Sequence, residues 1–342
     1  MAALVQRIRA RAASLPTFDI PFLLILLLLL SYGLIMLFSA GYAVALYRRG
    51  DAYTYIRPQL LFAALGVLAM YAASLVDYHV WHRLAWPMLG ISLLLLTIVL
   101  FMPEYNGCKR WIVLPGLGTL QPSEIAKFSI VLVFSHIISL NHDRMKSFST
   151  GVVPFALILG VVTVLMLLEP HLSGTLLILS IGAVLMFVGG TGLHWFGLAG
   201  GLGAAAIAAA VIALPELAGL GLGNSRQKYL YVPEPQNDFI FSILCEELGF
   251  IGAALVVALF LLLLLRGMSI AVRARDKFGA LLVVGFVVQV TLQAILNMAV
   301  VTNTIPNTGI SLPFFSSGGT SLLMLLGEMG IVLSVSRQTD MV

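Results

Sequence analysis

The chain has 342 residues, of which 60% are hydrophobic and 10% are charged, and its mean hydropathy is +1.03. This composition excludes an ordinary soluble domain and is typical of a helical protein that crosses a membrane several times. The net charge of +4 is informative through its distribution along the chain, and it is not a sign of nucleic-acid binding.

Ten apolar runs follow a basic tail, residues 1–18, that contains three arginines and no acidic residue. Such a tail is expected on the cytoplasmic side of a membrane. Each run is long enough to cross about 30 Å of hydrocarbon as a helix. The sequence therefore predicts an all-α fold in one transmembrane domain, residues 1–342, with spans at 20–39, 58–76, 84–102, 121–140, 150–168, 172–189, 194–214, 247–266, 278–302 and 320–337.

Basic residues test this arrangement, because they gather on the cytoplasmic side of membrane proteins. With the N-terminus inside, the cytoplasmic segments contain eleven Lys and Arg residues, the outer segments contain seven, and Lys127 lies within a span. This distribution favours both termini in the cytoplasm. Seven cations on the outer side are unusual, and an anionic ligand bound there would explain them.

The predicted outer segment at 215–246 concentrates charge in an otherwise apolar chain. Six charged residues lie at 220–249 among Gly, Pro and Asn residues that bend the backbone: Arg226, Lys228, Glu234, Asp238, Glu246 and Glu247. Ionisable groups at membrane depth are costly, which favours a functional interpretation. A solvated loop would explain Arg226 and Lys228, but it explains Asp238 poorly because this residue leads directly into the apolar run FIFSIL.

A second outer segment, NTIPNTGISLPFFSSGG at 303–319, is rich in Pro, Gly, Ser and Thr and is still apolar. Irregular backbone persists at membrane depth where it packs against protein or lines a wet cavity. We therefore expect a re-entrant or surface-lying segment that caps a cavity beside Asp238. A partly buried connector is the alternative.

The predicted helix at 121–140 opens with Gln-Pro-Ser-Glu. Pro122 suits the first turn of a helix, and Glu124 lies near the positive end of the helix dipole. Lys127 follows three residues after Glu124 on the same face, so the two can pair. The pair either locks the helix in place or lines a cavity shared with Asp238, and neither side chain should face lipid.

Two cationic pairs are predicted on the outer side. Lys109 and Arg110 precede Trp111 beyond the third span, and Arg226 and Lys228 form the second pair. Arginine grips phosphate oxygens with a planar fork, so two such pairs could hold a pyrophosphate. An interfacial anchor is the alternative for the first pair.

Two further polar groups have less specific interpretations. Gln289, Gln293 and Asn297 recur every fourth residue and form a stripe that either bonds to other helices or lines a cavity. Glu169-Pro170-His171 lies in an outer turn, where His171 could act as a weak base, although a capping role is favoured.

Four motifs resemble those of the SEDS family (shape, elongation, division and sporulation), which includes the FtsW, RodA and SpoVE proteins. They are RWI at 110–112, QPSEIAK at 121–127, GLGNSRQKYLYVPEPQNDFIFSILCEELG at 221–249 and PNTGISLPFFSSGGTS at 306–321. The motifs occur in the family's order, and the similarity extends over all ten predicted helices. GLGNSRQK and the end of the fifth helix resemble the division and sporulation branch more than the elongation branch.

The resemblance implies a peptidoglycan glycosyltransferase that polymerises lipid II into glycan strands at the outer face of the bacterial cytoplasmic membrane. It also implies a class B penicillin-binding protein as partner, which crosslinks the product. Asp238 matches the family's catalytic aspartate in PE-x-x-x-DFIF. The predicted substrate-binding residues are Arg110, Glu124, Lys127, Arg226, Lys228, Ser316 and Ser317.

The implied reaction needs a base for the attacking sugar hydroxyl and positive charge for the leaving pyrophosphate. A carboxylate such as Asp238 can act as the base. Either the outer cations or a divalent cation such as Mg²⁺ can stabilise the pyrophosphate, and no metal ligands are assigned. A single displacement would invert the sugar.

This sequence departs from the family pattern at two places. His171 stands where an acid is commoner, and the outer segment before Gly221 is shortened, since the predicted seventh helix ends near Leu214. Two rival functions stay open: a flippase for lipid-linked precursors, and a non-catalytic scaffold for a class B penicillin-binding protein. A flippase should carry ionisable groups at several depths on both sides, whereas here they gather on the outer side.

Overall fold

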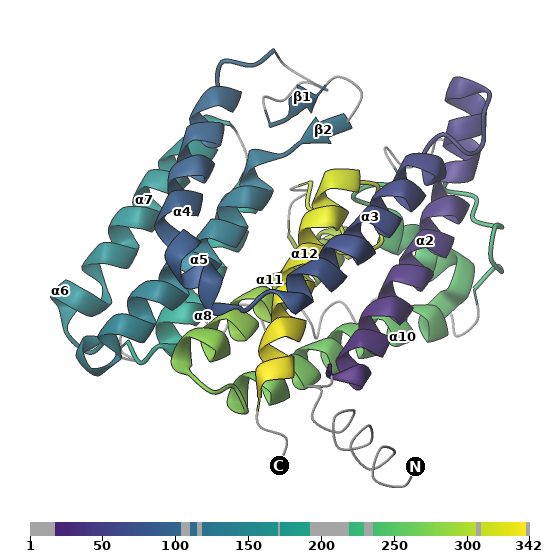
Figure 1. The fold of residues 1–342 in the computed structure, drawn as a ribbon. Coiled ribbons are helices and arrows are strands. Elements are labelled where there is room, and N and C mark those ends of the chain that lie inside the picture. Colours follow the sequence, from purple (N-terminus) through teal and green to yellow (C-terminus); the bar gives the residue numbers. More distant parts are fainter. Residues whose placement is uncertain are drawn as a thin grey trace, which may run out of the picture.

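The computed structural model describes residues 18–103, 110–114, 118–169, 172–191, 219–228, 235–305 and 309–339. These residues form a helical bundle with one short β-hairpin (Figure 1). The helices are α2 (Ile20–Arg49), α3 (Ile56–Leu75), α4 (His79–Val99), α5 (Pro122–Asn141), η1 (His142–Arg144), α6 (Phe148–Gly151), α7 (Val153–Leu168), α8 (Leu172–Val188), α10 (Ile240–Val272), α11 (Lys277–Val301) and α12 (Gly319–Gln338). The hairpin pairs β1 (Ile112–Leu114) with β2 (Gly118–Leu120) in antiparallel register.

Eight helical segments of the described chain are long and apolar enough to cross a membrane. They are α2, α3, α4, α5 with η1, α6 with α7, α10, α11 and α12, and α8 is a shorter apolar helix of 17 residues. The predicted class, a polytopic all-α membrane protein, is confirmed. The predicted span at 194–214 lies outside the described residues, and the β-hairpin was not predicted.

The described helices begin and end at two opposite ends of the bundle. At one end, which we call the terminal end, the backbone N–H of Asp19 before α2 donates to Ser336 Oγ near the end of α12, at 3.4 Å. The Asp19 carboxylate also pairs there with Arg266, with 2.8 Å between Arg266 Nε and Oδ1. The β-hairpin lies at the other end, which we call the hairpin end (Figure 1).

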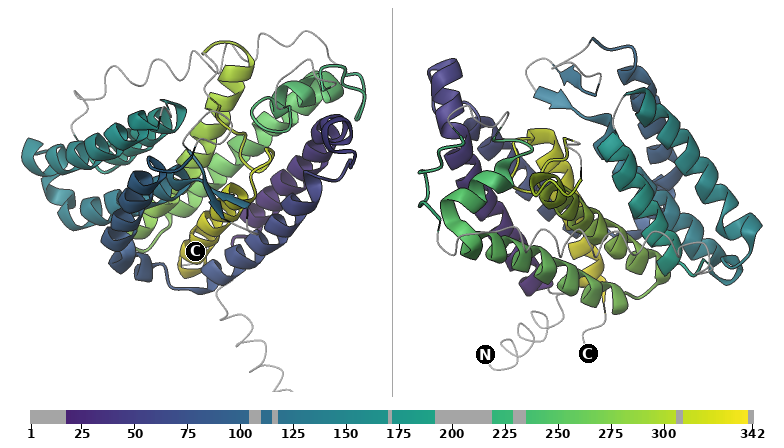
Figure 2. Two further views of the ribbon diagram at one scale, coloured as in Figure 1. Left: turned by 90° about the horizontal axis from the view of Figure 1, so that it is seen from above. Right: turned by 180° about the vertical axis from the view of Figure 1, so that it is seen from behind.

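Helices α5 and α11 are the most deeply buried of the membrane-crossing segments. They pack closely: a Cβ added to Gly285 of α11 would lie 2.4 Å from Val131 Cγ1 of α5. Asp276 fixes the start of α11, because its Oδ1 accepts the Gly279 N–H at 2.7 Å. Figure 2 shows α2 and α3 on one side of this centre and α4 and α7 on the other. The two buried helices therefore give a fixed platform for polar side chains at the hairpin end.

Helices α2 and α10 extend furthest beyond their predicted spans. Helix α2 continues to Arg49 instead of ending at residue 39. Helix α10 begins at Ile240 instead of residue 247, so the predicted outer segment 215–246 ends in two helical turns. The predicted start at residue 247 lies close to a break inside α10, where Gly249 has non-helical dihedral angles (φ +63°, ψ −157°). The structure tolerates Glu246 and Glu247 because neighbouring backbone and side-chain groups donate hydrogen bonds to both carboxylates.

Candidate functional site

A pocket of about 260 Å³ opens at the hairpin end of the bundle. Its wall comes from the strand β1 region, the start of α5, α8, α11, the turn before α10, the segment 309–318 and the start of α12. The lining residues are Arg110, Trp111, Gln121, Ser123, Glu124, Lys127, Gly174, Leu177, Asn237, Asp238, Gln293, Gly309, Ile310, Ser311, Ser317, Gly318 and Ser321. Polar and charged side chains predominate in a chain that is otherwise apolar.

Asp238 and Arg110 approach the same point in this pocket. A Cβ placed on Gly309 would lie 3.5 Å from Oδ2 of Asp238 and 3.7 Å from Nη1 of Arg110. Gly309 also has a φ of +72°, a conformation that L side chains rarely adopt. The backbone conformation therefore favours glycine at this position, and the two charged groups lie within van der Waals distance of the added Cβ.

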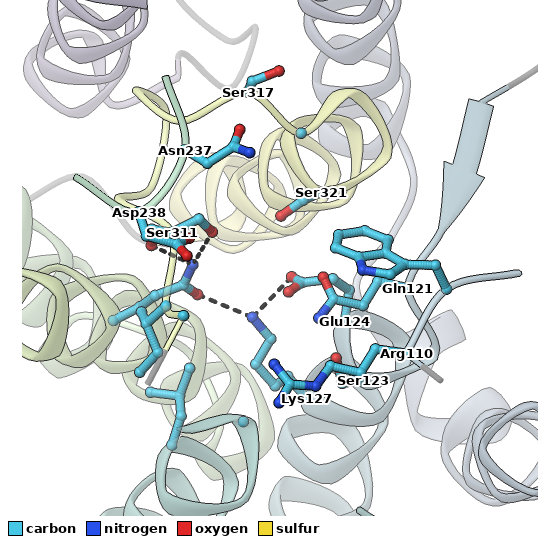
Figure 3. A pocket seen from close by; sticks show the side chains of 17 residues that line it. Arg110, Gln121, Ser123, Glu124, Lys127, Asn237, Asp238, Ser311, Ser317 and Ser321 are labelled. Atoms are coloured by element: carbon cyan, nitrogen blue, oxygen red, sulfur yellow. Dashed lines mark hydrogen bonds and ion pairs between the residues drawn. The ribbon is translucent and has the colours of Figure 1, made fainter. Parts of the chain in front are cut away.

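Glu124 and Lys127 form a buried ion pair in the opposite wall (Figure 3). Lys127 Nζ lies 2.8 Å from Glu124 Oε2, and their side chains are only 4% and 9% exposed. Lys127 Nζ also donates to Gln293 Oε1 of α11 at 2.9 Å. The prediction that both side chains face the bundle interior and approach each other is confirmed, and both line the pocket with Asp238.

The segment 309–318 closes one side of the pocket and is held by α11. Gln293 Nε2 donates to the Ser311 backbone oxygen at 3.1 Å and to Ser311 Oγ at 3.3 Å. Ser317 lines the pocket, as Figure 3 shows. The same Gln293 side chain therefore joins the segment to Lys127.

Ser316 has a different position from its neighbour. Its hydroxyl donates to the Asn237 backbone oxygen at 2.7 Å and accepts the Leu312 N–H at 2.8 Å. It does not line the pocket, although its side chain was predicted to bind substrate. Both hydrogen-bonding capacities of the hydroxyl are used for backbone, so the geometry gives Ser316 a structural role.

Lys228 lies outside the pocket, in contrast to its predicted phosphate-binding position. Its side chain is 2% exposed, and Nζ lies 3.0 Å from Glu247 Oε1 of α10. Nζ also donates to the Gly223 backbone oxygen at 2.5 Å, and Ser39 Oγ of α2 donates to Glu247 Oε2 at 2.6 Å. These contacts anchor the segment 219–228 between α2 and α10.

Arg226 is also outside the pocket, and its side chain is exposed. Its backbone N–H donates to Glu246 Oε1 at 2.9 Å, so the contact does not depend on the guanidinium. The predicted second cationic pair is therefore not assembled beside Arg110. Glu234 and Lys109, which were read from the sequence with these residues, lie outside the described residues.

The β-hairpin positions Arg110, the described member of the first predicted cationic pair. Thr320 Oγ1 at the start of α12 donates to the Thr119 backbone oxygen of β2 at 2.7 Å. This bond ties the hairpin to the pocket rim, and Arg110 and Trp111 enter the pocket wall immediately before β1. The predicted phosphate-binding residue Arg110 therefore lines the pocket, together with Trp111 beside it.

Two buried carboxylic acids near this region, Glu328 and Glu169, were given no role of their own in the sequence analysis. Glu328 of α12 is 2% exposed and accepts a hydrogen bond from Gln289 Nε2 at 2.9 Å. An acid in the middle of the last apolar run was a visible signal. Glu169, at the end of α7, is 1% exposed, and neither of its carboxylate oxygens has a hydrogen-bond partner within the described chain.

The Glu169 carboxyl predicts a pH dependence of stability. Burial raises its pKa from 4.5 to about 8, and the positive charge of Arg110 opposes that rise. Between these two pH values the folded protein binds the proton and the unfolded chain does not. Stability contributed by this group is therefore complete below pH 4.5 and falls, by at most about 1.4 kcal/mol per pH unit, as pH rises toward 8.

Glu169→Gln should remove this dependence, because glutamine stays neutral. We expect thermal unfolding of the detergent-solubilised variant to shift upward relative to the parent at pH 8, and the difference to shrink toward pH 5. An equal difference at both pH values would contradict a titrating Glu169. Glu246→Gln provides a control. Unlike Glu169, the Glu246 carboxylate accepts hydrogen bonds from Ser225 and Arg226, so its replacement should not raise the thermal stability at pH 8.

A divalent cation does not fit the described donors of the pocket well. The described residues include no group of three or more His, Cys, Asp or Glu that could hold a metal ion. Of the two pocket carboxylates, Glu124 is already paired with Lys127. The reaction steps below therefore use only the charges of the protein.

Comparison with known proteins identifies the family. The FtsW/RodA/SpoVE profile, described as "Cell cycle protein", matches residues 20–215 and 206–341. Stage V sporulation protein E of Bacillus subtilis is 36% identical over 358 residues, which cover 93% of this chain and 97% of that protein. A probable peptidoglycan glycosyltransferase FtsW of Geobacter is 34% identical over 369 residues, covering 94% and 97%.

Two solved structures are similar along almost the whole chain. The Rod shape determining protein RodA of Thermus thermophilus has a TM-score of 0.77 at 28% identity, over 95% of this chain and 98% of RodA. A chain of a peptidoglycan synthase complex has a TM-score of 0.76 at 26% identity, over 95% and 99%. Given the profile match and the similarity to SpoVE over nearly its full length, this chain belongs to the FtsW/RodA/SpoVE family.

Proposed function

We propose that this protein is a peptidoglycan glycosyltransferase that polymerises lipid II into glycan strands. The proposal rests on the approach of the Asp238 carboxylate and the Arg110 guanidinium to Gly309 inside the pocket. The reaction requires a base and a positive charge close together. The relatives named as probable peptidoglycan glycosyltransferases support the same activity here.

In the proposed reaction, the 4-hydroxyl of a GlcNAc residue attacks the anomeric carbon that carries the polyprenyl pyrophosphate. Asp238 accepts the hydroxyl proton as general base. The new carbon–oxygen bond forms as the bond to pyrophosphate breaks, and polyprenyl pyrophosphate leaves with the bonding electrons. One displacement on the anomeric carbon inverts its configuration.

Arg110 and Lys127 supply the positive charge in this mechanism. Arg110 lies near Asp238 and can stabilise the negative charge that develops on the leaving pyrophosphate. Lys127 is held by Glu124 and by Gln293, which together use two of its three N–H donors. Its ammonium group is therefore fixed in the pocket wall before substrate arrives, and it costs little reorganisation during the reaction.

We place the hairpin end at the outer face of the bacterial cytoplasmic membrane. Arg266 and Arg273 lie near Asp19 at the terminal end, and basic residues favour the cytoplasmic side. A class B penicillin-binding protein is the proposed partner, because the chain resembles a component of a peptidoglycan synthase complex. Cell division or sporulation is the favoured setting, given the FtsW and SpoVE relatives.

A non-catalytic scaffold is the second candidate function, and one observation favours it. The family profile matches in two segments that meet at residues 206–215, close to the shortened stretch before Gly221. The alignment with SpoVE also extends over 358 residues although the chain itself has only 342. If the missing stretch forms part of the substrate cavity, the protein would recruit its partner without polymerising lipid II.

Polymerisation of labelled lipid II by the purified protein, with and without the partner, tests the proposal. We expect glycan strands whose length increases with time. An active-site variant of the partner removes crosslinking and keeps the strands resolvable by electrophoresis. No strands from the protein with its partner, together with intact partner binding, would leave the scaffold function. Transport of labelled lipid II across sealed vesicles would identify a flippase.

Arg110→Ala should lower kcat/KM for lipid II, because it removes a cation from the pocket. Losing a hydrogen bond to a charged group costs about 1.5–3 kcal/mol, which corresponds to a loss of kcat/KM of about 10–100-fold. The measurement is the initial rate over a range of lipid II concentrations. Arg226→Ala is the matched control: Arg226 is exposed and outside the pocket, so its rate should stay near that of the parent. Equal losses in both variants would contradict the assignment.

A further inference from the structure

The turn that carries Asp238 is held by hydrogen bonds to three consecutive backbone oxygens. The Gln236 oxygen accepts the Ser317 N–H at 3.0 Å. The Asn237 oxygen accepts Ser316 Oγ at 2.7 Å, and the Asp238 oxygen accepts Asn297 Nδ2 at 2.8 Å. All three donors belong to other parts of the chain, so the turn is positioned from outside.

Of these three donors, Asn297 of α11 is the one that bonds to Asp238 itself. Its residue is fully buried, and it does not line the pocket. Besides the Asp238 oxygen, Nδ2 donates to the Ile310 oxygen at 2.6 Å. The two N–H groups of one amide therefore join the turn before α10 to the segment 309–318, the two pieces of backbone that meet beside Arg110.

The amide of Asn297 can face these two oxygens in only one way. If its oxygen pointed toward them, three acceptors would meet without a proton between them. With the nitrogen facing them, Oδ1 has no hydrogen-bond partner among the described residues. A buried acceptor without a partner is unfavourable, and this arrangement therefore indicates that the two donor bonds determine the side chain's orientation.

We propose that Asn297 is a positioning residue for the reaction, which it serves by fixing the backbone of Asp238. This proposal rests on the proposed function, in which Asp238 is the general base. At the start of α10, the Ser242 N–H donates to the Phe239 oxygen at 3.0 Å. The Asp238 oxygen lies one residue earlier, where Asn297 holds it.

The effect on the reaction follows from geometry. Without Asn297, the peptide after Asp238 can rotate, and the carboxylate moves away from the point at Gly309 that it shares with Arg110. Displacing a catalytic group by about 1 Å can cost about 10²-fold in rate. Because Asn297 does not line the pocket, its loss should lower kcat and leave KM almost unchanged.

The test compares polymerisation kinetics of the full-length protein with labelled lipid II and its partner. Asn297→Ala should lower kcat by about 10–100-fold, with KM within about threefold of the parent. Asn297→Ser is made beside it, because the shorter hydroxyl keeps the site polar but cannot reach both oxygens, and the same result is expected. Thermal unfolding of each variant is measured in parallel.

Gln289→Ala is the matched control, because Gln289 lies two turns away on the same face of α11 and bonds to Glu328 instead of to the pocket segments. It should lose stability to a similar extent while kcat stays within about threefold of the parent. An equal fall of kcat in Gln289→Ala and Asn297→Ala would overturn the proposal, and so would a rise of KM at unchanged kcat.

An Asp238→Asn arm separates the two proposals. If the parent is active and Asp238→Asn is inactive, the base assignment stands, and the Asn297 variants alone decide the positioning role. Activity in Asp238→Asn would overturn both, because Asn297 would then have no base to position.

Discussion

Replacement of Asp238 by asparagine is expected to lower the polymerisation rate by about 10²–10⁴-fold, the usual cost of losing a general base. Asparagine keeps the shape of the side chain and its capacity to accept a hydrogen bond, but it cannot take the proton of the attacking hydroxyl. The Asp238 backbone oxygen accepts a hydrogen bond from Asn297 Nδ2, and this bond does not depend on the carboxylate. The variant should therefore insert, fold and bind its partner normally.

Asp51→Asn is a suitable control for this variant. Asp51 also lies at the hairpin end, directly after α2, but its carboxylate is 43% exposed and pairs with Arg57 at 3.1 Å. Exposed pairs of this kind contribute little, so the rate should remain that of the parent. The measurement is the initial rate on labelled lipid II at equal amounts of folded protein. A near-parental rate in Asp238→Asn would mean that the base is elsewhere.

The polar residues inside apolar runs were the informative part of the sequence. Glu124 and Lys127 were expected either to lock their helix as an ion pair or to line a cavity shared with Asp238, and in neither case to face lipid. The structure brings all three to one pocket, together with Arg110 and Ser317. The i, i+3 spacing of Glu124 and Lys127 also predicted their contact, since three residues along a helix bring side chains to the same face.

The residues of the segment 219–228 could not be placed from the sequence. Sequence shows that Lys228 is a cation near Asp238 along the chain, but its partner, Glu247, lies nineteen residues later on α10. Which cations meet a ligand and which anchor the chain depends on tertiary pairing, and spacing along the chain does not reveal it.

For the polar stripe on α11, the sequence predicted the shared helix face but not the role of each residue. Its four-residue spacing predicted that Gln289, Gln293 and Asn297 share a face, and that face was expected either to bond other helices or to line a cavity. The structure contains both cases: Gln293 lines the pocket, whereas Gln289 bonds to Glu328 of α12. Periodicity fixed the face of the helix, and the neighbours of each position determined its role.

Breaking the ion pair of Lys228 and Glu247 is expected to give the largest loss of stability. Both side chains are almost completely buried, at 2% and 0% exposure, so neither charge can be compensated by water. Removing one partner of such a pair typically costs about 3–5 kcal/mol, mainly because the other charge remains buried. In Glu247→Gln, the buried Lys228 ammonium loses its negatively charged partner and still donates to the Gly223 backbone oxygen.

The two single replacements should differ in a predictable order. In Lys228→Met, the Glu247 carboxylate still accepts hydrogen bonds from Ser39 Oγ at 2.6 Å and from the Ser225 N–H at 3.4 Å. Lys228→Met should therefore be less destabilising than Glu247→Gln. The double replacement should cost less than the sum of the two, because it leaves no uncompensated charge. Thermal unfolding in detergent gives the coupling from the four proteins.

Arg226→Met is the control for this cycle, because Arg226 is an exposed cation in the same segment and only its backbone N–H enters the cluster. Its effect should stay within about 0.5 kcal/mol. If Lys228→Met were equally mild, Lys228 would not anchor the segment, and its side chain would again be a candidate for binding phosphate. A coupling near zero between Lys228 and Glu247 would lead to the same conclusion, since a buried pair that holds the segment in place must lose more when one charge is left alone than when both are removed.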